Sequence, residues 1–245
     1  MTIEVCAYSF NSCLVAQQAG AHRVELCGGL SEGGTTPSAG LIQLVRQHLT
    51  IALYVMIRPR GGDFLYSDTE RAVMRADIEA AKHAGADGVV LGLLRPDGTV
   101  DEEATRELVA LAHPLPVTFH RAFDMTRDAP EALEAVIRTG CARILTSGQH
   151  PSALTGAAVL QQLATQAAGR IEIMAGVGVS AQNAAQLAQT GVDALHLSGK
   201  SAQPSGMIYR RPNITMASAV LGEYERIEAS ADAIAQVVGL TTYQK

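Results

Sequence analysis

The sequence predicts one α/β domain over residues 1–245, folded as a (β/α)8 barrel, also called a TIM barrel. Three observations support this fold class. The chain has 245 residues, close to the roughly 250 that are usual for such a barrel. Short apolar segments alternate with helical segments from end to end, without a low-complexity linker. A helix-to-strand junction also recurs along the chain. An open doubly wound sheet is the second choice of fold.

Strand signals are short apolar runs bounded by turn residues, and helix signals are longer runs that follow a capping residue such as Ser9 and end at a glycine such as Gly20. The predicted strands are residues 3–8, 22–27, 51–58, 88–92, 116–120, 142–146, 171–175 and 194–197. The predicted helices are residues 11–19, 39–48, 68–84, 101–112, 129–139, 151–167, 180–189 and 217–239, the last being a closing helix after a long polar loop over residues 199–216.

The recurring junction has the form of a helix that ends at glycine, with a strand about two residues later. It occurs in Ala19-Gly-Ala-His-Arg-Val-Glu-Leu26, Ala84-Gly-Ala-Asp-Gly-Val-Val-Leu91, Thr139-Gly-Cys-Ala-Arg-Ile-Leu145 and Thr190-Gly-Val-Asp-Ala-Leu-His-Leu197. A left-handed glycine cap explains this pattern. Ordinary helix-to-strand loop chemistry would produce it too, but its return at every second unit favours a closed barrel.

Polar side chains fall on the face of the predicted strands that turns into the barrel, where Val, Ile and Leu are usual. Unpaired charges there would cost several kcal/mol each, so they must pair or line a wet cavity. A register shifted by one residue would instead send them among the apolar residues under the helices. The inward set comprises Glu4, Cys6, Glu25, Cys27, Met56, Arg58, Thr118, His120, His196 and Ser198.

The segment Pro116-Val-Thr-Phe-His-Arg-Ala-Phe-Asp124 concentrates titratable groups at one strand end. In parallel α/β folds the carboxyl ends of strands carry the functional residues. We therefore expect His120 to be a general acid/base, with Arg121 and Asp124 in the same catalytic group. Glu25 is expected to be a second acid/base or the group that orients His120, and either Arg58 or Arg121 to be the charge clamp. Glu4 is expected to orient a neighbour, and a role for His196 is left open.

The loop Ala175-Gly-Val-Gly-Val-Ser180 follows the seventh predicted strand, and Ser198-Gly-Lys200 follows the eighth. In these barrels the loops after strands seven and eight commonly hold a phosphate. Gly176, Gly178, Ser198 and Gly199 are thus candidates for a phosphate or anion site, because glycine lets backbone amides approach an anion. A structural tight turn would explain the same glycines.

Two of the four cysteines, Cys6 and Cys27, end adjacent predicted strands on the same face. Neighbouring strands are about 4.8 Å apart, so the two sulfurs could share one soft ion such as copper(I). Free cysteines also serve as small residues that fill a barrel end. Cys13 and Cys141 receive no assignment.

The net charge of −5 and the pI near 5.8 argue against nucleic acid and anionic membranes as partners and favour a small molecule. The sequence has no apolar run of membrane-spanning length and no signal-peptide pattern at its start, so we expect a cytoplasmic protein.

Several of these motifs together resemble the copper homeostasis protein CutC family, over nearly the whole chain to about Ser198. They include Arg23-Val-Glu-Leu-Cys27, Gly33-Gly-Thr-Thr-Pro-Ser38, Met56-Ile-Arg-Pro-Arg-Gly61, Arg143-Ile-Leu-Thr-Ser-Gly148 and Ile173-Met-Ala-Gly-Val-Gly178, with the segment that ends at Asp124. The resemblance implies a TIM barrel, a cytoplasmic homo-oligomer (dimer or tetramer), a role in copper homeostasis, and copper(I) ligands at Cys6 and Cys27.

Two main functions follow from these patterns. One is a copper-homeostasis protein that binds copper(I) through Cys6 and Cys27. The other is an enzyme that acts by acid/base chemistry on a small phosphorylated or carboxylated substrate. The sequence lacks a Cys-x-x-Cys or Met-x-x-Cys motif for metal transfer. A catalytically inactive scaffold is a third hypothesis.

Overall fold

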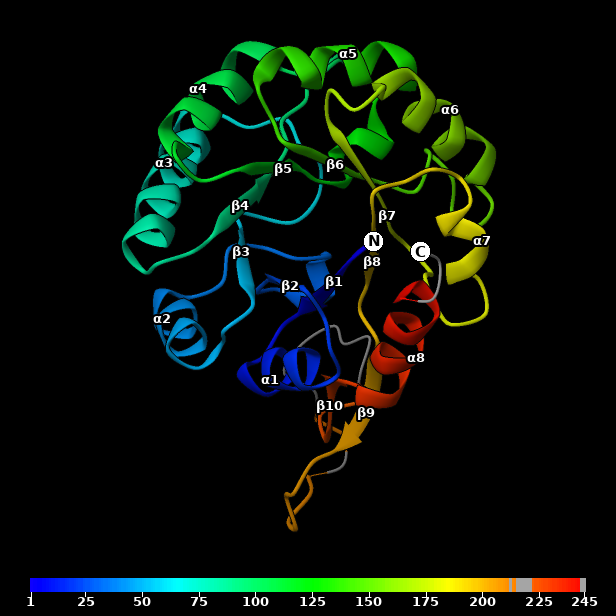
Figure 1. Ribbon diagram of the computed structural model, residues 1–245. Coiled ribbons are helices and arrows are strands. Elements are labelled where there is room, and N and C mark those ends of the chain that lie inside the picture. The colour runs from blue at the N-terminus through cyan, green and yellow to red at the C-terminus, as the bar shows by residue number, and fades with distance from the viewer. Residues whose placement is uncertain (212, 215–221, 243–245) are drawn as a thin grey trace.

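The computed structural model describes residues 1–211, 213–214 and 222–242. Eight parallel strands form a closed barrel in sequence order, and β8 pairs with β1 to complete it (Figure 1). The predicted fold class is thereby confirmed. The strands are β1 Thr2–Ala7, β2 Arg23–Leu26, β3 Ala52–Met56, β4 Gly88–Leu91, β5 Val117–Phe119, β6 Arg143–Thr146, β7 Glu172–Ala175 and β8 Ala194–Leu197.

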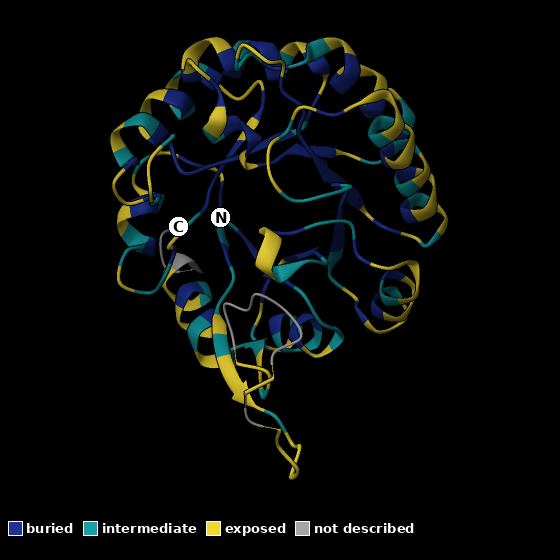
Figure 2. Cartoon of the chain, turned by 180° about the vertical axis from the view of Figure 1, so that it is seen from behind, coloured by how far each residue is buried: buried dark blue, intermediate teal, exposed yellow. Residues whose placement is uncertain are grey.

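Helices surround the barrel and present their exposed faces outward, while the strands are buried (Figure 2). Two short 3-10 helices, η1 Leu30–Glu32 and η2 Arg121–Met125, follow β2 and β5. The α-helices are α1 Phe10–Gln18, α2 Ala39–His48, α3 Asp68–His83, α4 Glu102–Ala112, α5 Ala129–Thr139, α6 Ala157–Ala167, α7 Ala184–Ala188 and α8 Ala231–Thr242.

Alternate side chains of a barrel strand face either the apolar layer between strands and helices or the inside of the barrel. Ile3, Val5 and Ala7 of β1 belong to the apolar core that strands and helices share. Glu4 and Cys6 turn the other way, into the barrel, and both are buried. The predicted strand register is therefore confirmed for β1, and polar groups reach the inside of the barrel.

The chain after β8 differs from the expected long loop and closing helix. A two-stranded antiparallel sheet, β9 Lys200–Pro204 with β10 Glu225–Ala229, projects beyond the ring (Figure 1). Glu228 fixes this hairpin to α1, because its carboxylate accepts hydrogen bonds from the hydroxyls of Ser9 and Ser12. The closing helix begins at Ala231, later than the predicted residue 217, and residues 217–221 lie outside the described residues.

Two further helices begin later than predicted. Helix α6 begins at Ala157 and not at residue 151, because the hydroxyls of Ser152 and Thr155 each accept a hydrogen bond from the other's backbone N–H and form a turn before it. Helix α7 begins at Ala184 and not at residue 180. The backbone N–H of Ser180 donates instead to the side chain of Asn183, which forms a turn before the helix.

Candidate functional site

A cavity of about 480 Å³ opens at the carboxyl ends of the barrel strands. Glu25, Arg58 and His120, from three different strand ends, all line it. The expected convergence of a carboxylate, a guanidinium and an imidazole on one opening is therefore present. Other lining residues include Cys6, Tyr8, Arg121, Gly178, His196, Ser198 and Lys200.

The two candidate metal-binding cysteines lie together at the floor of this cavity. Their Sγ atoms are 3.8 Å apart, and Sγ of Cys27 is 3.6 Å from Oε2 of Glu25. Cys6 is 8% exposed and lines the cavity, whereas Cys27 is fully buried behind it. The hydrogen bond from Cys27 lowers the pKa of Cys6 well below its usual value, and the same contact raises the pKa of Cys27. The pair thus favours one thiolate that accepts a hydrogen bond from one thiol.

Glu25 is 2% exposed, and burial followed by the negative charge of Cys6 raises the pKa of its carboxyl well above the usual range. Its Oε1 atom has no hydrogen-bond partner among the described residues. The other oxygen, Oε2, lies 3.8 Å from Nε2 of His196. Glu25 is therefore an incompletely paired acid beside the two thiols.

His196 and the buried Glu4 form a pair on neighbouring strands β8 and β1, in direct register. Nδ1 of His196 is 2.8 Å from Oε1 of Glu4, and Arg23 bonds the other carboxylate oxygen. Burial raises the pKa of Glu4, but the hydrogen bond from His196 and the charge of Arg23 outweigh it and bring the pKa to about 2. The neighbour that Glu4 was expected to orient is thus His196, which was not among the predicted site residues.

Arg58 does not lie free in the cavity as a charge clamp. Its guanidinium donates to the backbone carbonyls of Glu32, Gly34 and Gly62, at 2.7, 2.9 and 2.8 Å. The guanidinium carbon also lies 5.0 Å from the ring centre of Phe64. These contacts tie together the loops after β2 and β3, so the role of Arg58 is largely to shape the cavity wall.

His120 is buried against Phe64, with their ring centres 5.0 Å apart. The backbone N–H of Ala122 donates to its Nδ1 at 3.1 Å, so in the neutral ring the proton sits on Nε2. Burial, then the charge of Arg58, lowers the pKa of His120 to about 3. A ring that stays neutral at pH 7 is a weak general base, which differs from the expected role and leaves His120 a hydrogen-bond donor.

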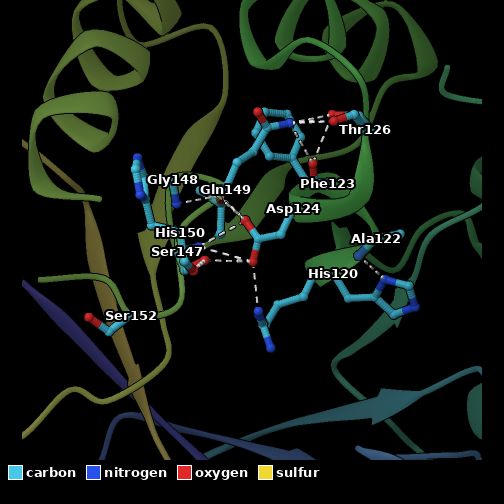
Figure 3. A network of polar contacts seen from close by, with 12 residues as sticks. His120, Ala122, Phe123, Asp124, Thr126, Ser147, Gly148, Gln149, His150 and Ser152 are labelled. Carbon is cyan, nitrogen blue, oxygen red and sulfur yellow. Dashed lines mark hydrogen bonds and ion pairs between the residues drawn. The ribbon is translucent and has the colours of Figure 1, made fainter. Parts of the chain in front are cut away.

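Asp124 is not among the residues that line the cavity. It organises the neighbouring loop through the hydrogen bonds drawn in Figure 3. Its carboxylate accepts hydrogen bonds from Thr146 at 2.5 Å and from the backbone and hydroxyl of Ser147, and Arg121 donates to it at 2.8 Å. The His120 ring points away from this carboxylate (Figure 3). Because its oxygens are fully engaged, Asp124 is better described as a support for the loop after β6 than as a catalytic acid.

The predicted anion-binding residues separate in the structure. Gly178 and Ser198 line the cavity, whereas Gly176 and Gly199 do not. The Gly176 N–H bonds the Thr146 carbonyl, and a Cβ at this position would meet Leu145 at 2.6 Å. Gly176 is thus required for packing, and helix α7 begins too late to direct its first amides at this loop.

The closed parallel barrel and the polar cavity at its strand ends define this molecule as a TIM-barrel protein with one candidate site rich in sulfur, carboxylate and imidazole groups. The sequence model of the CutC family matches residues 1–201. The chain belongs to this family.

Relatives of known name support the assignment. A CutC family protein from Chromobacterium violaceum is 51% identical over 95% of this chain and 94% of its own length. The human copper homeostasis protein cutC homolog is 50% identical over 91% of this chain and 82% of its own length. A crystal structure of CutC from Streptococcus agalactiae is 37% identical and has a TM-score of 0.77, covering 81% of this chain and 98% of that one.

Proposed function

We propose that this protein binds copper(I) through the thiols of Cys6 and Cys27 and thereby serves copper homeostasis. The observation that carries the proposal is the separation of 3.8 Å between the two Sγ atoms. Two sulfurs bonded at about 2.3 Å to one tetrahedral ion are about 3.8 Å apart, so little movement is needed to share a metal. Thiolates are the ligands that copper(I) prefers, and the human relative is named as a copper homeostasis protein.

Access and charge also favour the thiol pair. Cys6 lines the cavity, so an ion can reach its sulfur from solvent, while Cys27 closes the inner side. The depressed pKa of Cys6, caused first by the hydrogen bond from Cys27, supplies a thiolate before the metal arrives. Metal binding then releases the proton of Cys27.

Anaerobic titration of copper(I) against a competing chelator tests the proposal. The Cys6→Ser, Cys27→Ser double variant should lose the tight site, with an affinity loss larger than the roughly 10- to 100-fold typical of an outer partner. The matched control is Cys13→Ser, Cys141→Ser, which replaces the other two buried cysteines. Unchanged copper stoichiometry and affinity in the first variant would refute the proposal.

A second candidate function, an enzyme acting on a small phosphorylated or carboxylated substrate, is favoured by one observation. Among the described residues, the backbone N–H groups of Val177, Gly178 and Val179 have no hydrogen-bond acceptor, and all three residues line the cavity. Arg121 and Lys200 add positive charge to the same lining. Free amides and cations together form a binding environment for an anion. His120 would donate a hydrogen bond to such a substrate from Nε2.

Titration of inorganic phosphate, followed by ¹⁵N NMR, tests this second function. The amide signals of residues 177–179 should shift in a saturable way, and Lys200→Gln should weaken the response several-fold by removing one cation. Lys82→Gln, on helix α3 and outside the cavity lining, is the matched control for loss of a lysine charge. Amide signals that stay fixed up to high phosphate would count against the enzyme hypothesis.

We also propose that the protein is a cytoplasmic homo-oligomer. None of the described helices is long and apolar enough to span a membrane. All four cysteines are free, as in proteins from reducing compartments. The hairpin beyond β8 presents Met207, Ile208 and Tyr209 with 56, 100 and 66% exposure, and exposed apolar groups of this kind support assembly into a dimer or tetramer.

A further inference from the structure

A second set of metal donors overlaps the thiol pair. Cys6, Glu25 and His196 each place one ligand atom within 4.8 Å of the other two. They come from β1, β2 and β8, which are neighbours in the barrel, because Cys6 pairs with Glu25 and Glu4 pairs with His196 in the strand register. All three side chains line the cavity, whereas Cys27 does not. The three donors therefore share access to one point on the cavity floor.

The carboxylate in this set has an unused oxygen. Oε1 of Glu25 has no hydrogen-bond partner among the described residues, although the side chain is only 3% exposed. A buried oxygen without a donor is costly, and a bound cation removes that cost. This observation is independent of the cysteine geometry and indicates a ligand beside Glu25.

The imidazole is already oriented as metal-binding histidines are. A carboxylate can only accept a hydrogen bond, so the contact of 2.8 Å between Glu4 and Nδ1 of His196 places the ring proton on Nδ1. Metal binding requires the neutral ring, so it releases the proton from Nε2, and the freed lone pair faces Glu25, whose Oε2 is 3.8 Å away. A carboxylate behind the histidine, itself held by Arg23, is the usual outer partner of a histidine ligand.

We propose that Cys6, Glu25 and His196 form a binding site for one divalent ion of the zinc type, with its fourth position open to the cavity. A tetrahedral ion with metal–sulfur bonds of about 2.3 Å and metal–nitrogen or metal–oxygen bonds of about 2.0–2.1 Å needs donor separations of about 3.3–3.6 Å. The observed separations are 3.8 Å between Nε2 of His196 and Oε2 of Glu25 and within 4.8 Å for the whole set, so the side chains must move closer together around the ion. Three protein ligands and an open position are typical of zinc sites that activate water or a substrate oxygen.

This site deepens the proposed function, because it shares Cys6 with the copper(I) pair, but its other ligands differ. A soft monovalent ion selects the two sulfurs, whereas a borderline divalent ion accepts nitrogen and oxygen donors as well. Cys27 is then an outer partner that contacts Cys6 and Glu25. The two modes compete for the same thiolate, so binding of one metal should exclude the other.

Cobalt(II), a spectroscopic substitute for zinc, separates the two modes. In the full-length protein under anaerobic, reducing conditions, Co²⁺ should give the intense visible bands of a tetrahedral ion and a near-ultraviolet thiolate-to-metal band. His196→Asn should lose these bands and weaken Co²⁺ binding at least tenfold while copper(I) binding persists. Cys27→Ser should show the opposite pattern, and Glu25→Gln is the second test variant if His196→Asn lowers the melting temperature.

The outcomes distinguish this inference from the proposed function. If wild-type protein gives no tetrahedral Co²⁺ spectrum, or if both His196→Asn and Glu25→Gln bind Co²⁺ like wild type, the divalent site is refuted. Loss of Co²⁺ binding in His196→Asn with retention in Cys27→Ser supports it. Copper(I) binding that survives in Cys27→Ser would refute the thiol-pair proposal and leave the divalent site standing.

Discussion

Two histidines on the inner face of the same barrel have pKa values that are shifted in opposite directions. Burial and then the charge of Arg58 lower the pKa of His120 to about 3, so its ring stays neutral. The side chain of His196 is 12% exposed, and its partial burial lowers its pKa, but the carboxylates of Glu25 and Glu4 and the hydrogen bond with Cys6 more than reverse this effect. The groups that surround a histidine side chain therefore determine the direction of its pKa shift.

The state of His120 predicts an acid-sensitive fold. The unfolded chain takes up a proton on His120 near pH 6.5, whereas the folded chain does so only near pH 3. Stability is thus complete above pH 6.5 and is lost as the pH falls through the window between these values. From pH 7.5 to 5.5 this one group should lower the free energy of unfolding by about 1.4 kcal/mol.

Urea unfolding at the two pH values measures this contribution. His120→Gln, which cannot titrate, should lose less stability than wild type over the same interval, by about 1.4 kcal/mol. His150→Gln, at an exposed histidine after β6, is the matched control. An equal pH dependence in wild type and His120→Gln would show that the buried ring is not held neutral.

For single residues, the direction of a side chain could be predicted from the sequence, but its hydrogen-bond partners could not. The inward positions of Glu25, His120 and Cys6 could be predicted, because side-chain direction alternates along a strand. The engagement of Arg58 with three backbone carbonyls could not, since those carbonyls belong to loops whose path the sequence does not determine. Likewise, the inward direction of His196 could be predicted, but its partner could not, because Glu4 meets it only when β8 pairs with β1.

At the scale of elements, the predictions succeeded where periodicity was strong and failed where polar contacts decide. The eight barrel strands are mostly buried and alternate apolar residues toward the helices with other residues toward the inside, and all eight were predicted. Strand β9 is mostly exposed and polar, so it carries no apolar alternation, and it forms because β10 pairs with it. The hydrogen bonds of Asp124 could not be predicted for a similar reason. Its partners Thr146 and Ser147 come from the next βα unit and are invisible to a local pattern.

At the scale of the whole molecule, the barrel is completed by residues beyond the stretch that matches the family model. That match ends at residue 201, within β9, yet α8 begins at Ala231. Helix α8 packs against α1 and α7 and buries Ile234 and Val237 completely. The backbone of Gly199 passes so close that a Cβ there would lie 2.9 Å from Ile234. Closure of the helix ring thus depends on the C-terminal segment, although the site residues precede it.

This dependence predicts that a substitution in α8 destabilises the entire barrel. Ile234→Ala should lower the free energy of unfolding by about 2–5 kcal/mol, because it leaves a cavity between α8 and the barrel. Leu240→Ala, on the same helix but 42% exposed, should change it by no more than about 0.5 kcal/mol. Urea unfolding followed by far-ultraviolet circular dichroism measures both variants. One cooperative transition, shifted to lower urea with an unchanged slope, is expected for Ile234→Ala. A wild-type midpoint for that variant would mean that the packing of α8 does not stabilise the barrel. Helices α1 to α7 would then be sufficient to keep the ring closed.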